Sequence, residues 1–250
     1  MPLCLSIEGL AARRGDAPIF RDLSFRVAGA EVLVVTGANG SGKSTLLRIV
    51  AGLLRPEAGR VRITGLDEAG DAQADDPQRR REACHYLGHR NGLKAELTVL
   101  DNLAFWRALA SVESRKAGLP VEAALDAVGL AALAHLPAGV LSAGQSRRAA
   151  LARLLVAHRP VWLLDEPTAA LDAASDAMVA ALILAHVRAG GLAVAATHQP
   201  LDLPGALRLA MPARPDLLDE TQEGAPDDGF WLDARHGTGG AGDRPRRDAR

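Results

Sequence analysis

The chain has 250 residues, 48% of them hydrophobic and 24% charged, which suffices for one large domain or for one domain with a subdomain. The formal net charge of −1 at pH 7 lacks the basic excess that nucleic-acid binding usually requires, so no nucleic-acid ligand is expected. The two cysteines, Cys4 and Cys84, are far apart. They fit a reducing compartment, argue against disulfides and a zinc site, and predict Cys84 to be a half-buried strand residue.

A membrane-spanning segment is not predicted. No stretch approaches the roughly 18 consecutive apolar residues that cross a bilayer. Residues 1–8 show no basic segment followed by an apolar one, so no signal peptide is expected. The chain is therefore expected in the cytoplasm, and a membrane process would require it to dock on a separate integral-membrane chain.

The N-terminal part is predicted to be an antiparallel hairpin. Apolar and polar residues alternate from Leu3 to Val27, and a turn falls at residues 14–16. Two further strands are expected at residues 32–35 and 60–63, with a helix between them that ends near Gly52. Residues 67–82 are polar and charged, which indicates a solvated loop and the start of a surface helix.

The residues between the apolar run 32–35 and the apolar helix 46–50 form the pattern G-x-x-x-x-G-K-[ST]. In this pattern the glycines let the backbone wrap an anion, the N–H groups point inward, and the next helix presents its positive end. ATP is therefore the expected ligand, with Lys43 at the outer phosphates and Ser44 ligating Mg2+. A chance turn with an unpaired surface lysine is the alternative, and the flanking strand and helix argue against it. The candidate binding residues are Gly37, Ala38, Asn39, Gly40, Ser41, Gly42, Lys43, Ser44 and Thr45.

The middle of the chain is predicted to be helical. Apolar periodicity beyond His89 indicates an inserted helical subdomain at about residues 90–158. Thr98 followed by Asp101 indicates one helix start, with Asp in place of the Glu or Gln of a full capping box. Buried strands are expected at residues 161–164 and 192–196, and continuous apolar strands separated by helices imply a parallel sheet covered on both faces.

The apolar pattern fades after about Met211 into Pro, Asp, Gly and Arg. Residues 212–250 are therefore predicted to be a largely disordered tail, and residues 1–211 to be the folded domain. Binding of the basic tail to anionic lipid is an alternative that its interspersed Asp residues weaken.

Polar residues follow three predicted strands of the core sheet. Because open parallel sheets bind ligands at the carboxyl ends of their strands, the phosphate loop, the pair Asp165-Glu166 and His198 are expected to converge. A carboxylate that closes an apolar strand needs a cation, so we expect Ser44 and Asp165 to hold Mg2+, the latter directly or through water. Glu166 is the candidate group that polarises the attacking water, and Lys43 and His198 are the candidate contacts of the terminal phosphate. A mere helix cap for the Asp-Glu pair, and a core position for His198, are the alternatives.

A second candidate anion site lies about a hundred residues after the first. Leu141-Ser142-Ala143-Gly144-Gln145 opens a predicted helix over 147–156, and a helix start presents N–H groups and a positive dipole. An ordinary Ser-capped helix start is the alternative when the segment is taken alone.

The order of these motifs, with Leu171-Asp172 after the Asp-Glu pair, resembles the nucleotide-binding domain of ABC ATPases over residues 3–209. The resemblance implies an α/β P-loop NTPase fold with a mostly parallel core sheet, an N-terminal antiparallel β subdomain and an inserted helical subdomain. It also implies that two copies stack head to tail around two ATP molecules. Ser142, Gly144 and Gln145 would then bind the terminal phosphate of the other copy's ATP, and Asp172 would lie at the dimer seam.

Three positions depart from the general family pattern. Ala143 replaces the usual first glycine of the signature, His89 stands where most relatives have a glutamine, and Arg14 stands where an aromatic ring usually stacks on adenine. A guanidinium plane can also stack on a base. Because the charge of histidine changes near neutral pH, His89 predicts pH-sensitive hydrolysis.

With the segments 86–94 and 197–201, these departures resemble the ATPases of haem export in c-type cytochrome maturation. The resemblance implies a peripheral ATPase at the cytoplasmic face of the inner membrane, bound to the integral-membrane permease subunits of a cytochrome c maturation complex. The permease contact is expected at about residues 91–106. Two alternatives stay open at this point, an ATPase of a different small-molecule exporter and a non-transport ABC protein acting on DNA or ribosomes.

Overall fold

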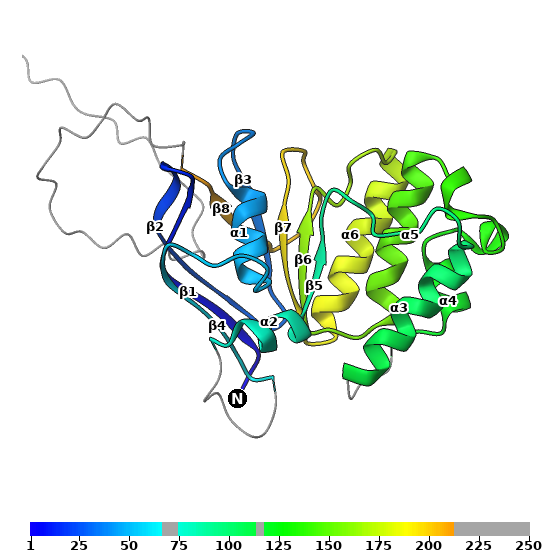
Figure 1. The fold of residues 1–250 in the computed structure, drawn as a ribbon, viewed down its shortest axis with the longest axis horizontal. Coiled ribbons are helices and arrows are strands. Elements are labelled where there is room, and N and C mark those ends of the chain that lie inside the picture. Colours follow the sequence, from blue (N-terminus) through cyan, green and yellow to red (C-terminus); the bar gives the residue numbers. More distant parts are fainter. Residues whose placement is uncertain (67–74, 114–117, 213–250) are drawn as a thin grey trace, which may run out of the picture.

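The computed structural model describes residues 1–66, 75–113 and 118–212. Two sheets and the helices around them make up this part of the chain (Figure 1). Most of the predicted polar loop, residues 67–74, and the predicted disordered tail from residue 213 onward lie outside the described residues.

The first sheet contains β1 (Cys4–Arg14), β2 (Ala17–Ala28) and β4 (Ala58–Thr64) in the order β2-β1-β4. Both pairings are antiparallel, with Ile7 opposite Phe25 on one side and Val61 on the other. The predicted N-terminal hairpin is thus confirmed, and the predicted strand at 60–63 lies within β4, the third strand of this sheet.

The second sheet is parallel throughout and has the order β5-β6-β7-β3-β8. Its strands are β3 (Val32–Thr36), β5 (Cys84–Leu87), β6 (Val161–Asp165), β7 (Leu192–Ala196) and β8 (Leu207–Ala210). All five residues of both β6 and β7 are buried, as expected for strands covered on both faces. The predicted parallel core sheet is confirmed, and the carboxyl ends of its strands lie at one edge.

Helices cover both faces of the core sheet (Figure 1). The helix α1 (Lys43–Val50) packs between the two sheets, and α2 (Pro77–Ala83) leads into β5. The other face carries α3 (Val99–Glu113), α4 (Val121–Ala127), α5 (Ala143–Val156) and α6 (Ala173–Arg188), with the short helices η1 (Ala131–Leu133) and η2 (Ala138–Val140). The predicted start of α3 is confirmed, since Thr98 Oγ1 accepts a 3.0 Å hydrogen bond from the Asp101 N–H. The helices α3, α4 and α5, and the short helices η1 and η2, all fall within the predicted helical segment 90–158, whose separation as a subdomain stays a prediction.

Two apolar clusters, one on each face of the core sheet, hold these layers together. Trp162 and Leu164 of β6 enter the cluster with α3, α4, α5 and α6, whereas Val161 and Leu163 enter the cluster with α1 and the first sheet. This alternation follows from the two-residue period of a strand. Cys84 is only 6% exposed, so the expectation of a half-buried cysteine is wrong. It pairs with Val161 at the start of the buried strand β6 and belongs to the apolar cluster on that face of the sheet.

Two histidines, the buried His85 and the half-buried His186, lie at the edge of the core sheet opposite the nucleotide-binding motifs. His85 Nε2 lies 2.6 Å from the Ala157 carbonyl oxygen, and burial lowers the pKa of His85 to about 3. The His186 ring stacks on Trp162 with centroids 4.1 Å apart, and burial lowers the pKa of His186 to about 4. Both rings are therefore uncharged in the folded chain at neutral pH.

These two histidines predict a loss of stability in mild acid. The unfolded chain binds their protons near pH 6.5, whereas the folded chain resists protonation down to pH 3 or 4. The full contribution of the two neutral rings to the free energy of unfolding is thus present above pH 6.5. Below pH 6.5 this free energy falls by roughly 1.4 kcal/mol per pH unit for each histidine. Urea denaturation at pH 7.5 and 5.5 measures this loss, and His186→Gln is expected to reduce it while the exposed His135→Gln is not. An equal loss in all three chains would contradict the assignment.

Candidate functional site

The phosphate loop leaves β3 and enters α1 through a glycine that no other residue could replace without strain. Gly42 has φ 99°, and a Cβ there would lie 2.5 Å from Ile19 Cγ2. Gly42 is also the N-cap of α1, and no side chain of the described residues caps the helix at this point. The first N–H groups of α1 are therefore available to an anion.

Polar groups of the loop are buried and incompletely satisfied. Lys43 is 7% exposed, and its Nζ donates to the carbonyl oxygens of Gly37 (2.7 Å) and Ala38 (3.1 Å). Ser41 Oγ is buried and has no hydrogen-bond partner among the described residues. A buried cation held only by carbonyl dipoles, together with an unpartnered hydroxyl, suits a phosphate ligand.

The carboxylate of Asp165 ends β6 and is 1% exposed. Among the described residues, its hydrogen-bond donor is the hydroxyl of Tyr86, 3.3 Å away, and no basic side chain lies at ion-pair distance. Burial raises the pKa of Tyr86, so this hydroxyl stays a donor. An ionised carboxylate with one neutral donor favours a nearby divalent cation, and Ser44 lines the same cavity. Residues present here thus fit the expected Mg2+.

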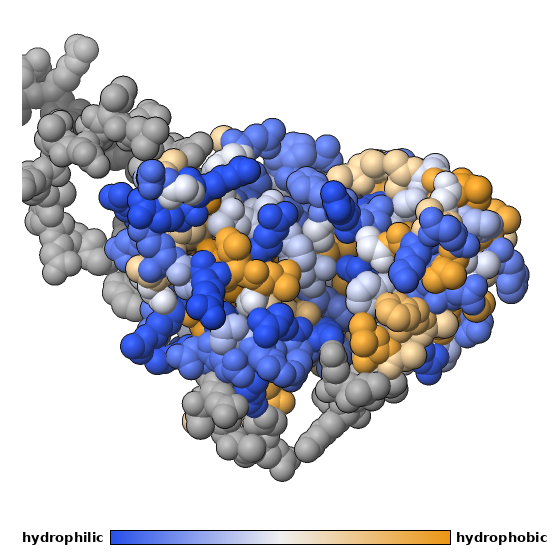
Figure 2. Space-filling model, viewed as in Figure 1, coloured by the Kyte–Doolittle hydropathy of each residue, from blue (hydrophilic) through white to orange (hydrophobic). Residues whose placement is uncertain are grey.

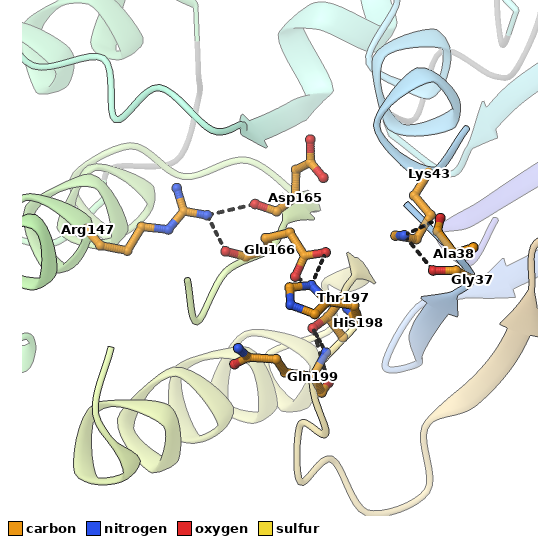
Figure 3. A network of polar contacts seen from close by, with 9 residues as sticks. All are labelled: Gly37, Ala38, Lys43, Arg147, Asp165, Glu166, Thr197, His198 and Gln199. Atoms are coloured by element: carbon orange, nitrogen blue, oxygen red, sulfur yellow. Dashed lines mark hydrogen bonds and ion pairs between the residues drawn. The ribbon is translucent and has the colours of Figure 1, made fainter. Parts of the chain in front are cut away.

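Glu166 follows Asp165 and adopts an unusual backbone conformation, with φ 49°. Its N–H donates to the Ala196 carbonyl oxygen at 2.8 Å. The His198 ring holds its side chain, with Nδ1 2.8 Å from Glu166 Oε1, and the His198 N–H donates to Oε2 at 3.4 Å (Figure 3). This carboxylate therefore has a defined direction, as a group that orients a water molecule requires.

One cavity of about 540 Å3 joins these groups. It receives the carboxyl ends of β3, β5, β6 and β7, because all these strands run in one direction. His198 is at its wall with a half-exposed side chain, so the alternative of a core histidine is wrong. The residues lining the cavity are Arg14, Ile19, Asn39, Gly40, Gly42, Lys43, Ser44, Thr45, His89, Asp165, Glu166 and His198.

Seven of the predicted site residues do not line this cavity: Gly37, Ala38 and Ser41 belong to the phosphate loop itself, whereas Ser142, Gly144, Gln145 and Asp172 lie elsewhere. Ser142 Oγ accepts from the Gln145 N–H (3.2 Å) and Gln145 Oε1 accepts from the Ser142 N–H (2.9 Å), a complete capping box at the start of α5. Asp172 caps α6 through Ser175, and these hydrogen bonds lower the pKa of Asp172. A Cβ on Gly144 would lie 3.1 Å from the Ala170 carbonyl oxygen, so the two helix starts are neighbours. They form a second polar surface separate from the cavity.

Two residues of the site were not assigned a role from the sequence. Tyr86 reaches Asp165 only through the pairing of β5 with β6, for which the sequence carries no signal. Arg147 donates hydrogen bonds to the carbonyl oxygens of both Asp165 and Glu166 (Figure 3). A signal for Arg147 does exist, because it shares helical spacing with the buried residues Ala150, Leu151 and Leu154. A charged residue on a buried helix face requires polar partners.

Known proteins match most of this chain. The ABC transporter family model matches residues 20–169. The cytochrome c biogenesis ATP-binding export protein CcmA of Rhizobium etli is 57% identical over 207 residues, which cover 83% of this chain and 94% of that protein. None of the described helices combines the length and the apolar character needed to cross a membrane.

Solved structures share the fold. A putative ABC transporter ATP-binding protein from Pyrococcus furiosus superposes with a TM-score of 0.68 at 22% identity, covering 83% of this chain and 97% of that chain. A dimeric ATP-binding cassette in a post-hydrolysis state, bound to ADP and Pi, has a TM-score of 0.64 at 25% identity, covering 78% of this chain and 88% of that chain. These similarities confirm the predicted fold class.

Proposed function

Because this chain belongs to the ABC transporter family, and within it to the group of cytochrome c biogenesis ATP-binding export proteins, we propose that it is the ATP-hydrolysing subunit of a transporter for c-type cytochrome assembly. Its ATP hydrolysis would energise haem export or the release of haem from a haem chaperone. Residues 1–211 would form the ATP-binding domain, with a helical subdomain at about residues 90–158.

The observation that carries this proposal is the single cavity shared by the phosphate loop and three strand ends. The loop N–H groups and Lys43 would hold the phosphates of ATP, in place of the carbonyl contacts that Lys43 makes now. A magnesium ion held by Ser44 and Asp165 would neutralise phosphate charge. Glu166, oriented by His198, would polarise the attacking water and accept its proton.

The remaining contacts to ATP would come from a second copy of the chain. Ser142, Gly144, Gln145 and Asp172 lie outside the cavity, and Ser142 and Asp172 are exposed. A head-to-tail dimer would bring this surface of one copy to the terminal phosphate in the other. The similar cassette in its dimeric, ADP-bound and Pi-bound form supports such an assembly. Arg14 and His89, which line the cavity, would contact the adenine and the terminal phosphate respectively.

The membrane partner would dock on the side of α3. Figure 2 shows apolar side chains gathered on the surface over α3 and α4. The exposed large apolar residues of α3 and the segments beside it are Leu97, Phe105, Leu109, Leu119, Leu136 and Val140. An exposed apolar patch of this kind marks an interaction surface, which supports a permease contact at residues 91–106 and a peripheral position at the cytoplasmic face of the inner membrane.

Capture of the partner tests this proposal. Glu166→Gln is expected to lower hydrolysis by about 100-fold or more while the chain still binds ATP. With ATP and Mg2+, the tagged variant should therefore retain a dimer and an integral-membrane subunit of a cytochrome c maturation complex, identified by mass spectrometry. The double variant with Lys43→Ala is the matched control, because it should not bind ATP.

Two further results decide between the candidate functions. Deletion of the gene should abolish holo-cytochrome c, whereas an ATPase of a different small-molecule exporter would leave it intact. Co-purification with ribosomes in place of membranes, or failure of the Glu166→Gln chain to retain nucleotide, would contradict the proposal.

A further inference from the structure

Arg147 uses every N–H of its guanidinium to hold two loops of the cavity. Nη2 donates to the carbonyl oxygens of Asp165 and Glu166, both at 2.7 Å, and Nε donates to that of Pro167 at 3.2 Å. Nη1 donates to the Gly88 carbonyl oxygen at 2.8 Å and to Asn91 Oδ1 at 3.2 Å. The five donors of an arginine are thus all satisfied.

These partners surround a charge that is almost fully enclosed. Arg147 is 4% exposed, and burial lowers its pKa while the nearby carboxylates of Asp165 and Glu166 raise it. Four of its five acceptors are backbone carbonyls and none is a carboxylate. A neutral residue on this buried helix face would cost less desolvation free energy. The presence of an arginine is therefore explained by the two loops that its guanidinium holds together.

The first of the two loops carries Glu166, whose backbone is in the left-handed region that residues with a side chain rarely adopt. At φ 49°, Glu166 needs its backbone fixed by neighbours. Its N–H is held by Ala196 and its carbonyl oxygen by Arg147, one from each side. Figure 3 shows Arg147 reaching this backbone from the side opposite Lys43 and the phosphate loop.

The second loop connects β5 to the helical segment and carries His89, which lines the cavity. Arg147 bonds this loop on both sides of His89, at Gly88 and at Asn91. Asn91 also lines a separate surface cavity of about 400 Å3 that extends to Ala138 and Ser146. One side chain therefore fixes the spacing between the backbone of Glu166 and the loop of His89.

We propose that Arg147 is a positioning residue for ATP hydrolysis, which sets the place of the Glu166 carboxylate relative to the loop 88–91 without contacting ATP. This role rests on the proposed function, in which Glu166 acts on the attacking water. Since a lysine has one nitrogen with three donors, Arg147→Lys keeps the charge but cannot make the five contacts. Geometry, and not charge alone, is therefore what Arg147 supplies.

The test measures the kinetics of the full-length chain carrying Arg147→Lys or Arg147→Gln. A small displacement of a catalytic group lowers the rate by about 100-fold, so both variants should lose about that factor in kcat. KM and the affinity for a fluorescent ATP analogue should stay within about threefold, because the phosphate loop is untouched. Arg148→Lys is the matched control: this neighbour bonds the Val128 and Gly129 carbonyl oxygens, away from the cavity, and should leave kcat unchanged.

A double-mutant cycle separates positioning from general stability. If Arg147 acts through Glu166, Arg147→Lys should cause no further loss of kcat in the Glu166→Gln background. Multiplied losses in the double variant, or a parallel loss of ATP binding in both Arg147 variants, would overturn the proposal. If the wild-type chain itself fails to hydrolyse ATP, the proposed function is wrong. If Arg147→Lys has a normal kcat while Glu166→Gln is slow, only the positioning role of Arg147 is rejected and the proposed function stands.

Discussion

Lys43→Ala is expected to reduce the affinity for ATP by at least about 30-fold, since removing one partner of a buried charged hydrogen bond costs about 2–5 kcal/mol. Lys43 is 7% exposed, and its Nζ already lies against the carbonyl oxygens of Gly37 and Ala38 at the centre of the loop. In the ATP-bound chain the same nitrogen would turn to the outer phosphates. Titration of a fluorescent ATP analogue into the purified chain measures the change.

The matched control for this loss is Arg188→Ala. Arg188 is exposed in the last turn of α6, so its replacement removes the same charge far from the cavity. Its affinity for the analogue should equal that of the wild type. Far-UV circular dichroism of the two variants checks that both chains are folded. Unchanged affinity in Lys43→Ala would reject the loop as the phosphate site.

Local sequence signals sufficed for the phosphate loop and the strand ends. The glycines around Lys43 require a backbone that wraps an anion, and a carboxylate at the end of an apolar strand requires a polar partner. Hydrophobic alternation predicted the hairpin of β1 and β2, and continuous apolar runs predicted the two-sided burial of β6 and β7. These features depend on neighbours in the chain, which is why a single sequence reveals them.

Contacts between distant segments could not be predicted in this way. The hydrogen bond from the Tyr86 hydroxyl to the Asp165 carboxylate depends on β5 lying next to β6 in the sheet. The reach of Arg147 to Glu166 depends on how α5 packs against that edge of the sheet. Likewise, the burial of Cys84 depends on its pairing with Val161 of β6 and on the apolar cluster to which it belongs. Topology and packing set all three, and neither leaves a fixed spacing in the sequence.

Mixing two inactive variants is expected to restore ATP hydrolysis if each site is shared between two copies. Lys43→Ala inactivates the cavity of its own chain. Ser142→Asp keeps the cap of α5 but places a negative charge that repels the phosphate bound by the other copy. In an equal mixture half of the dimers contain one of each chain, and every such dimer has one intact site. About one quarter of the wild-type activity should therefore return, measured as phosphate release at fixed total protein.

The control mixture pairs Lys43→Ala with Glu166→Gln. Lys43 and Glu166 line the same cavity of one chain, so a mixed dimer of these variants has two broken sites and no activity should return. Ser142→Asn, which keeps the cap without the charge, should remain far more active than Ser142→Asp. Recovery in the control mixture, or none in the first, would contradict a head-to-tail site. Full activity of the Ser142→Asp chain alone would show that hydrolysis needs only the cavity of a single copy.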